Sequence, residues 1–146
     1  MLPPRPSTSR ILTITLLASL PLVAIGSPLR AAPTDIPVRT VESRLHRVDR
    51  LEYDASWSEA SQFFQQKLTT ENWEAILKFT RAPIGTVIAR RHTLTQYASH
   101  LPGIPDGTYA ILQFHSAFTG KDSTVETVIF SEEPDGQWRA IGYSMK

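Results

Sequence analysis

The sequence predicts an α+β domain in which about three N-terminal helices pack on one face of a four-stranded antiparallel meander sheet. Up to about residue 80, apolar residues recur every three or four positions, which is the spacing of a helix with one buried side. After Gly85 the pattern changes to an alternation of apolar and polar residues, which is typical of strands. Short turn sequences at Thr119–Asp122 and Pro134–Gly136 separate the later strands, so we expect consecutive strands to pair antiparallel.

Three helices are expected before the sheet, each with an apolar stripe along one side. The stripes are Val38, Val41, Leu45 and Val48; then Trp57, Ala60, Phe64 and Leu68; and finally Trp73, Ile76, Leu77 and Thr80. Ser56–Glu59 fits a capping box, in which the serine and glutamate side chains bond free backbone groups at a helix start. The second helix is therefore expected to begin there. Thr70 can cap the third helix, which Pro83 and Gly85 end.

Four strands are expected, at residues 86–99, 109–118, 123–133 and 137–145, and the first is a polar edge strand. The turn lengths place His115 opposite Glu126 and Ser144 beside Glu126, on the sheet face away from the helices. The residues expected on the helix-facing side are Leu112, Phe114, Val125, Ile129, Ile141 and Tyr143. This register decides which polar groups meet, because a slip of one residue reverses every side chain of a strand.

The first 26 residues have the pattern of a signal peptide. Arg5 and Arg10 supply positive charge, and an uncharged, mostly apolar stretch of 15 residues follows from Ile11 to Ile25. Small residues predict a cut between Gly26 and Ser27. The apolar stretch is shorter than the roughly 20 residues that a membrane-spanning helix needs. An uncleaved anchor and an ordinary buried helix are therefore the less favoured alternatives.

Removal of the signal peptide would leave one domain in the bacterial periplasm or outside the cell. Residues 27–37 contain three prolines and no periodic pattern, so we expect a tether there, followed by a single domain at residues 38–146. A second small-residue site after Ala31 leaves two possible starts for the mature chain. No attachment to a membrane is expected after cleavage.

The composition excludes several classes of function. The chain has 15 basic and 14 acidic residues, and loss of the two leader arginines leaves 13 against 14. No basic surplus remains for a phosphate backbone, so nucleic acid is not an expected partner. The chain has no cysteine, and its four histidines form no HExxH motif, so we expect no metal site. The seven glycines form no phosphate-binding loop, and no cofactor is expected.

A series of residues from Tyr53 onward resembles a known family. They are Tyr53, Ser56–Trp57, Trp73, Arg81–Gly85, Arg90, Leu101–Tyr109, Gln113, Phe118, Lys121, Val125–Val128, Asp135–Arg139 and Gly142–Tyr143. In these residues the chain resembles an uncharacterised bacterial secreted family, domain of unknown function 4019, over about residues 50–146. The resemblance implies a secreted bacterial protein and supplies no activity. In architecture alone, the order of elements is also similar to the nuclear transport factor 2-like fold, and a fold does not fix a function.

The loop of residues 101–107 is the first candidate for binding. Its two prolines and two glycines predict a stiff segment. It is either a rigid connection between strands or a lip that contacts a ligand or partner through Leu101 and Ile104. Arg90, on the polar edge strand, is either solvated or part of an anion-contacting patch with basic residues of the preceding helix.

The second candidate site is the cluster of His115, Glu126 and Ser144. A carboxylate beside a histidine can tune it as a general base, although such a pair is more often a surface ion pair. No nucleophile motif accompanies the pair, and we therefore assign no catalytic residue.

These features favour a non-catalytic module that binds a small molecule or an envelope protein. The alternative is a small cofactor-free hydrolase or isomerase with a pocket between helices and sheet. An apolar recess lined by aromatic residues would support the binding module, whereas convergent groups with perturbed pKa values would support the enzyme. An envelope interaction domain with an exposed apolar sheet face is a third possibility.

Overall fold

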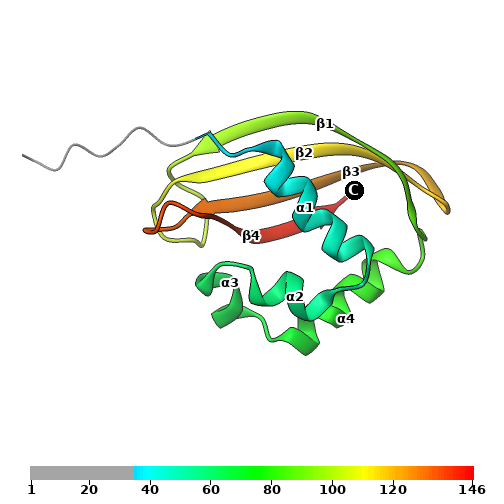
Figure 1. Cartoon of the computed structure of the whole chain (residues 1–146), viewed down its shortest axis with the longest axis horizontal. Helices are drawn as coiled ribbons and strands as arrows, with labels where there is room; N and C mark the ends of the chain where they lie inside the picture. The colour runs from blue at the N-terminus through cyan, green and yellow to red at the C-terminus, as the bar shows by residue number, and fades with distance from the viewer. Residues whose placement is uncertain (1–34) are drawn as a thin grey trace, which may run out of the picture. The chain divides into compact units, whose positions relative to one another are not determined.

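The computed structural model describes residues 35–146, and the predicted leader and residues 27–34 of the predicted tether lie outside them. Helices α1 (Val38–Asp49), α2 (Tyr53–Ser58), α3 (Gln62–Lys67) and α4 (Thr70–Arg81) precede strands β1 (Val87–Ala98), β2 (Tyr109–Phe118), β3 (Lys121–Glu132) and β4 (Trp138–Met145). The strands form one sheet in the order β1-β2-β3-β4, each antiparallel to the next (Figure 1). The predicted α+β meander is confirmed, with four helices in place of three.

The second predicted helix is divided into α2 and α3. Ser56 lies inside α2, where its hydroxyl donates to a carbonyl of the preceding turn at 2.8 Å, so the predicted capping box is wrong. Ser61 caps α3 instead, and its backbone N–H donates to the carbonyl of Ala140 on β4 at 2.9 Å. This bond ties the chain to the sheet between the two short helices. Thr69, one residue before the predicted cap, caps α4, and its side chain accepts a hydrogen bond from the backbone N–H of Asn72.

Two clusters of apolar side chains join the helices to the sheet. Figure 1 shows α1 lying across one face of the sheet, with α2, α3 and α4 next to β4. The buried members of the first cluster, between α1 and the sheet, are Ile36, Val41, Leu45, Ala110, Leu112, Phe114, Val128, Phe130 and Trp138. Those of the second cluster are Val48, Trp73 and Leu77, with Trp57, Phe64 and Tyr143 packed against them. The predicted core positions of Trp57, Phe64 and Trp73 are therefore confirmed.

Strand β3 is shifted by one residue from its predicted register against β2. Glu126 pairs with Phe114, and His115 pairs with Val125. The side chains of Glu126, Val128 and Phe130 are buried. These residues lie on the side of the core, so the prediction that Val125 and Ile129 share that face is wrong. The prediction for Leu112 and Phe114 on β2 is confirmed, since both are fully buried in the core.

The cause of this shift lies in the turn between β2 and β3. Phe118 pairs directly with Lys121, so the connection has two residues rather than the predicted four. A register irregularity between Ser116 and Phe118 then moves the pairing back by one residue. The net displacement from the predicted register is one residue. An odd displacement moves every side chain of β3 to the opposite face of the sheet.

The hairpin of β3 and β4 follows the predicted register only next to its turn. There the backbone N–H of Glu133 donates to the carbonyl of Gln137 at 2.9 Å. A register shift farther along brings Ser144 opposite Thr127 rather than beside Glu126. Ser144 is exposed, on the face away from the core. The predicted cluster of His115, Glu126 and Ser144 is therefore wrong.

Candidate functional site

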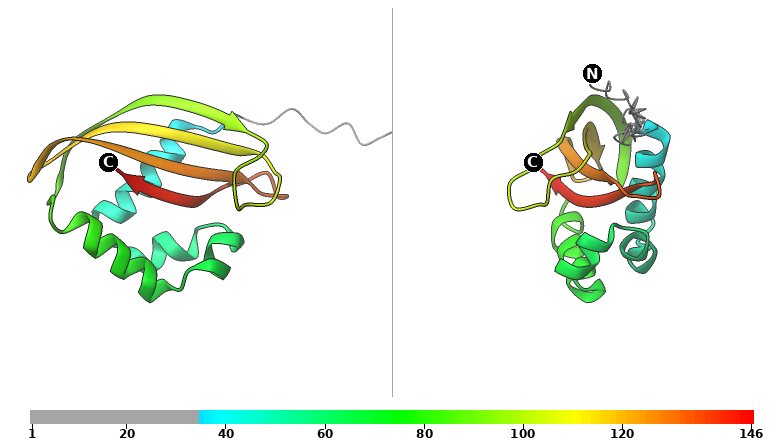
Figure 2. Two further views of the ribbon diagram at one scale, coloured as in Figure 1. Left: turned by 180° about the vertical axis from the view of Figure 1, so that it is seen from behind. Right: turned by 90° about the vertical axis from the view of Figure 1, so that its left-hand side faces the viewer.

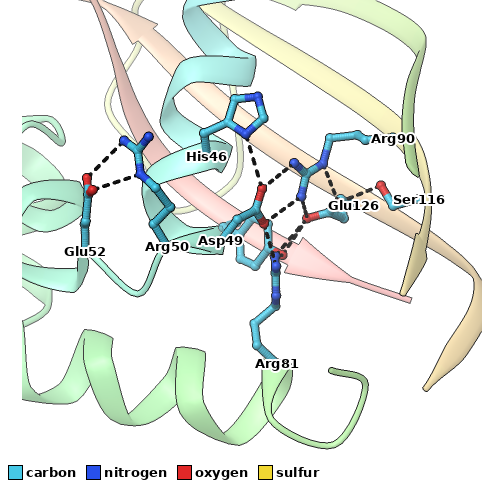
Figure 3. Close-up of polar contacts among 9 residues, drawn as sticks. His46, Asp49, Arg50, Glu52, Arg81, Arg90, Ser116 and Glu126 are labelled. Atoms are coloured by element: carbon cyan, nitrogen blue, oxygen red, sulfur yellow. Dashed lines mark hydrogen bonds and ion pairs between the residues drawn. The ribbon is translucent and has the colours of Figure 1, made fainter. Parts of the chain in front are cut away.

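The register of β3 brings Glu126, a fully buried carboxylate, into a polar network with residues from five other elements. We call these six residues the buried ion network, and Figure 3 labels its members except Tyr143. Its members are Asp49 on α1, Arg81 on α4, Arg90 on β1, Ser116 on β2, Glu126 on β3 and Tyr143 on β4. Two arginines face two carboxylates, so the formal charges balance.

Each carboxylate is bonded by both arginines. Arg90 donates to Asp49 at 2.7 and 3.0 Å and to Glu126 at 2.7 and 3.2 Å. Arg81 donates to Asp49 at 2.5 Å and to Glu126 at 3.3 Å. The hydroxyls of Ser116 and Tyr143 donate to Glu126 at 2.6 and 2.7 Å. The network thus satisfies the hydrogen-bonding needs of charges that would otherwise be costly to bury.

Burial and the contacts within the network shift the pKa values of Asp49, Tyr143 and Arg90. Burial opposes ionisation of Asp49, but the bonds from Arg90 and Arg81 outweigh it and hold its pKa below the usual value. Burial and then the charge of Glu126 raise the pKa of Tyr143. The pKa of Arg90 is also raised, because its bonds to the two carboxylates outweigh the effect of burial. These groups stay in one state near neutral pH, which suits a structural lock rather than proton transfer.

The predicted anion patch around Arg90 is only partly formed. Arg90 and Arg81 do meet, but Asp49 and Glu126 occupy their guanidinium groups. Lys78 is exposed and pairs with Glu74 at 2.5 Å instead. Arg90 is 9% exposed and is therefore not the solvated edge residue that was the other interpretation.

His115 is exposed on the opposite face of the sheet from Glu126. Its Nε2 lies 3.1 Å from the hydroxyl of Ser123, its neighbour across the hairpin. His115 therefore has no carboxylate opposite it, and the observation that suggested a general-base role is missing.

The loop of residues 101–107 covers Tyr109 on the sheet face away from α1. The Tyr109 hydroxyl donates to the carbonyl of Pro105, and the ring is 5% exposed. His100 and Asp106 meet at the base of the loop, where Nδ1 of the histidine lies 2.6 Å from Oδ1 of the aspartate. Figure 2, in its right-hand view, shows the loop on the other side of the sheet from α1. Leu101 and Ile104 are half-buried, and their contact with a partner stays a prediction.

A small apolar recess lies between the helices and β4, where the enzyme alternative expected a pocket. Phe64, Trp73 and Tyr143 line it together with Leu45 and Ala60. The rings meet edge to face, with centroids 5.2 Å apart for Phe64 and Trp73 and 6.3 Å apart for Trp73 and Tyr143. The recess has a volume of about 40 Å³. This is about three water positions at 10–15 Å³ each.

The polar groups at this recess are already bonded. The hydroxyl of Ser56 accepts from the Trp73 indole at 2.8 Å and donates to the Tyr53 carbonyl. Arg44, at the edge of the recess, forms an ion pair with Glu59. The walls of the recess are therefore mainly apolar and aromatic, and its polar groups already have partners within the protein.

Basic residues of α1 surround one side of the recess. Arg44 and Glu59 also line an open groove of about 370 Å³ that includes Arg39 and Arg47. Arg47 bonds the second oxygen of Glu59 at 2.7 Å. Burial, and then the charges of Arg47 and Arg139, lower the pKa of Arg44. Glu52 also bonds Arg47, at 3.1 Å, so Arg39, Arg44 and Arg47 face two carboxylates and an excess of positive charge remains at this edge.

Fold and site together define a helix-and-meander α+β domain with a buried ion network and a small apolar recess. A family model described as "Protein of unknown function (DUF4019)" matches residues 40–143. The chain belongs to this family, and the resemblance found in the sequence is confirmed. No curated protein and no solved structure matches the chain, and the similarity to the nuclear transport factor 2-like fold is not confirmed.

Two features absent from residues 35–146 bear on the type of site. None of their helices is long and apolar enough to cross a membrane. No three histidine or acidic side chains in this part of the chain come together in a way that could hold a metal ion.

Several members of the buried ion network have signals in the sequence that our reasoning missed. Arg81 follows Trp73 and Leu77 at intervals of four, so it extends the buried stripe of α4. Asp49 ends α1, where the helix dipole disfavours a negative charge and a cationic partner is expected. Tyr143 was predicted in the core, but its hydroxyl partner depends on the position of Glu126.

Proposed function

We propose that the chain is an exported, non-catalytic binding domain and that the apolar recess is its ligand site. Export is supported by the signal-peptide pattern of residues 1–26. Family membership supplies no activity.

One contrast within the described residues carries the proposal of binding over catalysis. The buried charged groups of the network bond one another, so none of them offers an unbonded acid or base to a substrate. The recess, by comparison, is aromatic and apolar and adjoins a groove on the surface. Aromatic walls with few polar groups are the usual surroundings of a bound apolar group.

Export and binding are tested on protein purified from the periplasm or medium after expression of the full chain. N-terminal sequencing should find a start at Ser27 or Ala32, and a start at Met1 would overturn the export proposal. The purified protein is then incubated with a small-molecule extract of the host. The protein concentration is kept well below the concentrations of the metabolites. Native mass spectrometry should find an added mass on the protein, with no metabolite consumed. Progressive loss of a metabolite beyond one equivalent would instead identify an enzyme.

A further inference from the structure

We infer that the recess and the groove beside it bind a small amphipathic anion: one apolar ring or branched alkyl group joined to a carboxylate. This inference rests on the proposed function and names the ligand class of the same site. The apolar group occupies the recess between Phe64, Trp73 and Tyr143. The carboxylate lies at Arg44 and Arg47, where Glu59 is now bonded.

The size and polarity of the recess define the apolar part of the ligand. A volume of about 40 Å³, or about three water positions, accepts a short branched chain or the leading edge of a single ring whose remainder lies at the mouth of the recess. The indole N–H of Trp73 is bonded to Ser56 at 2.8 Å, and the Tyr143 hydroxyl is bonded to Glu126 at 2.7 Å. The aromatic walls therefore offer ring faces and edges rather than hydrogen-bond partners. A polar group placed there would lose its hydration without compensation.

The charge of the groove defines the other part of the ligand. Three arginines, Arg39, Arg44 and Arg47, line it with one carboxylate, Glu59. Arg39 forms no ion pair with any of residues 35–146, so its charge is available. Guanidinium groups bind carboxylates through paired N–H donors, which gives both strength and orientation.

The recess and the groove are continuous at two side chains. Arg44 and Glu59 line both, so a carboxylate at Arg44 is adjacent to an apolar group in the recess. A ligand with both parts gains from both surfaces at once, whereas a cationic analogue would meet the arginines with the wrong sign. In the free protein Glu59 pairs with Arg44 and Arg47, and Glu52 pairs with Arg47, so both carboxylates compete with the incoming one.

The probes for this inference are 3-phenylpropionate, its neutral amide, 3-phenylpropylamine and propionate. Binding to the processed protein is measured by calorimetry and by the change in total tryptophan fluorescence, to which Trp73 in the wall of the recess contributes. We expect 3-phenylpropionate to bind at least about tenfold more tightly than the amide, which corresponds to about 1.4 kcal/mol. The amine and propionate should bind more weakly than either. Equal affinity for the carboxylate, amide and amine would overturn the inference.

Two variants change the recess and the groove separately. Ala60→Leu fills the recess and should abolish binding of the ring-containing probes. Glu59→Gln removes the competing carboxylate and should raise affinity for 3-phenylpropionate several-fold, with little change for the amide. Arg91 is exposed on β1 and lies outside the groove. The variant Arg91→Gln is therefore the matched control and should bind the probes like the parent protein. If Ala60→Leu fails to fold, the result for Glu59→Gln alone tests the inference. Unchanged or weaker binding of 3-phenylpropionate to the Glu59→Gln variant would overturn it.

Failure of this inference is distinguishable from failure of the proposed function. If no probe binds while native mass spectrometry still finds an added mass from the host extract, the ligand class is wrong and the binding domain stands. If a metabolite is turned over, the proposed function itself is wrong.

Discussion

Replacement of Arg90 by methionine tests the buried ion network most directly. Methionine keeps an unbranched apolar stem but removes the guanidinium, which donates to Asp49 and Glu126 at distances from 2.7 to 3.2 Å. Arg81 then faces two carboxylates alone, and its bond to Glu126 is long, at 3.3 Å. Breaking a buried ion pair in this way costs about 3–5 kcal/mol of unfolding free energy. We expect the upper half of that range, because Glu126 is 0% exposed.

Urea unfolding at pH 7 measures this loss. Arg91→Met is the control, because Arg91 is exposed and should change the unfolding free energy by no more than about 0.5 kcal/mol. A second arm combines Arg90→Met with Glu126→Gln, which removes one charge of each sign. The double variant should lose less than the sum of the single variants, by about 1 kcal/mol or more. A loss below about 1 kcal/mol for Arg90→Met would refute a buried pair of this strength.

Three further changes test the pH dependence, the core and the loop. Folded Asp49 has a lowered pKa, so the stability it contributes is present above the ordinary aspartate pKa of about 3.9. That contribution should be lost as pH falls through the folded pKa, and in acid titrations of stability Asp49→Asn should lack this part of the decline. Phe114→Ala should cost about 3–5 kcal/mol in urea melts because the ring is fully buried, and a loss below about 1 kcal/mol would place it outside the core. Serine at both Leu101 and Ile104 should lower the thermal midpoint by several degrees, since both residues are half-buried. An unchanged midpoint would instead favour the lip that contacts a partner.

The helical half of the fold could be predicted because its signals are local. The apolar stripe of α1 follows directly from residue spacing, and Val41, Leu45 and Val48 are buried as expected. The division between α2 and α3 could not be predicted in this way. It depends on the bond from the backbone of Ser61 to Ala140, which lies far along the chain on β4.

The candidate site could be predicted only in part, because its chemistry depends on strand register. The alternation of β3 alone is compatible with either face, and the choice is made by a two-residue turn and an irregularity near Phe118. With one residue of error, Glu126 becomes a surface neighbour of His115 rather than the buried partner of Arg90. Arg90 was predicted to be either a solvated edge residue or an anion contact, and its bonds to Asp49 and Glu126 could not be predicted without the position of Glu126.

The buried ion network and the apolar recess depend on each other through the elements they share. Asp49 ends α1, Arg81 ends α4 and Tyr143 lies on β4. The same three elements supply Leu45, Trp73 and the Tyr143 ring to the walls of the recess. A packed recess of this size loses its shape if one wall moves by a fraction of the width of a side chain. The network, with bonds of fixed direction between α1, α4 and β4, is what prevents that movement. We therefore expect Arg90→Met to weaken the binding of 3-phenylpropionate even though Arg90 does not line the recess. Full affinity in a folded Arg90→Met protein would show that the two features are independent.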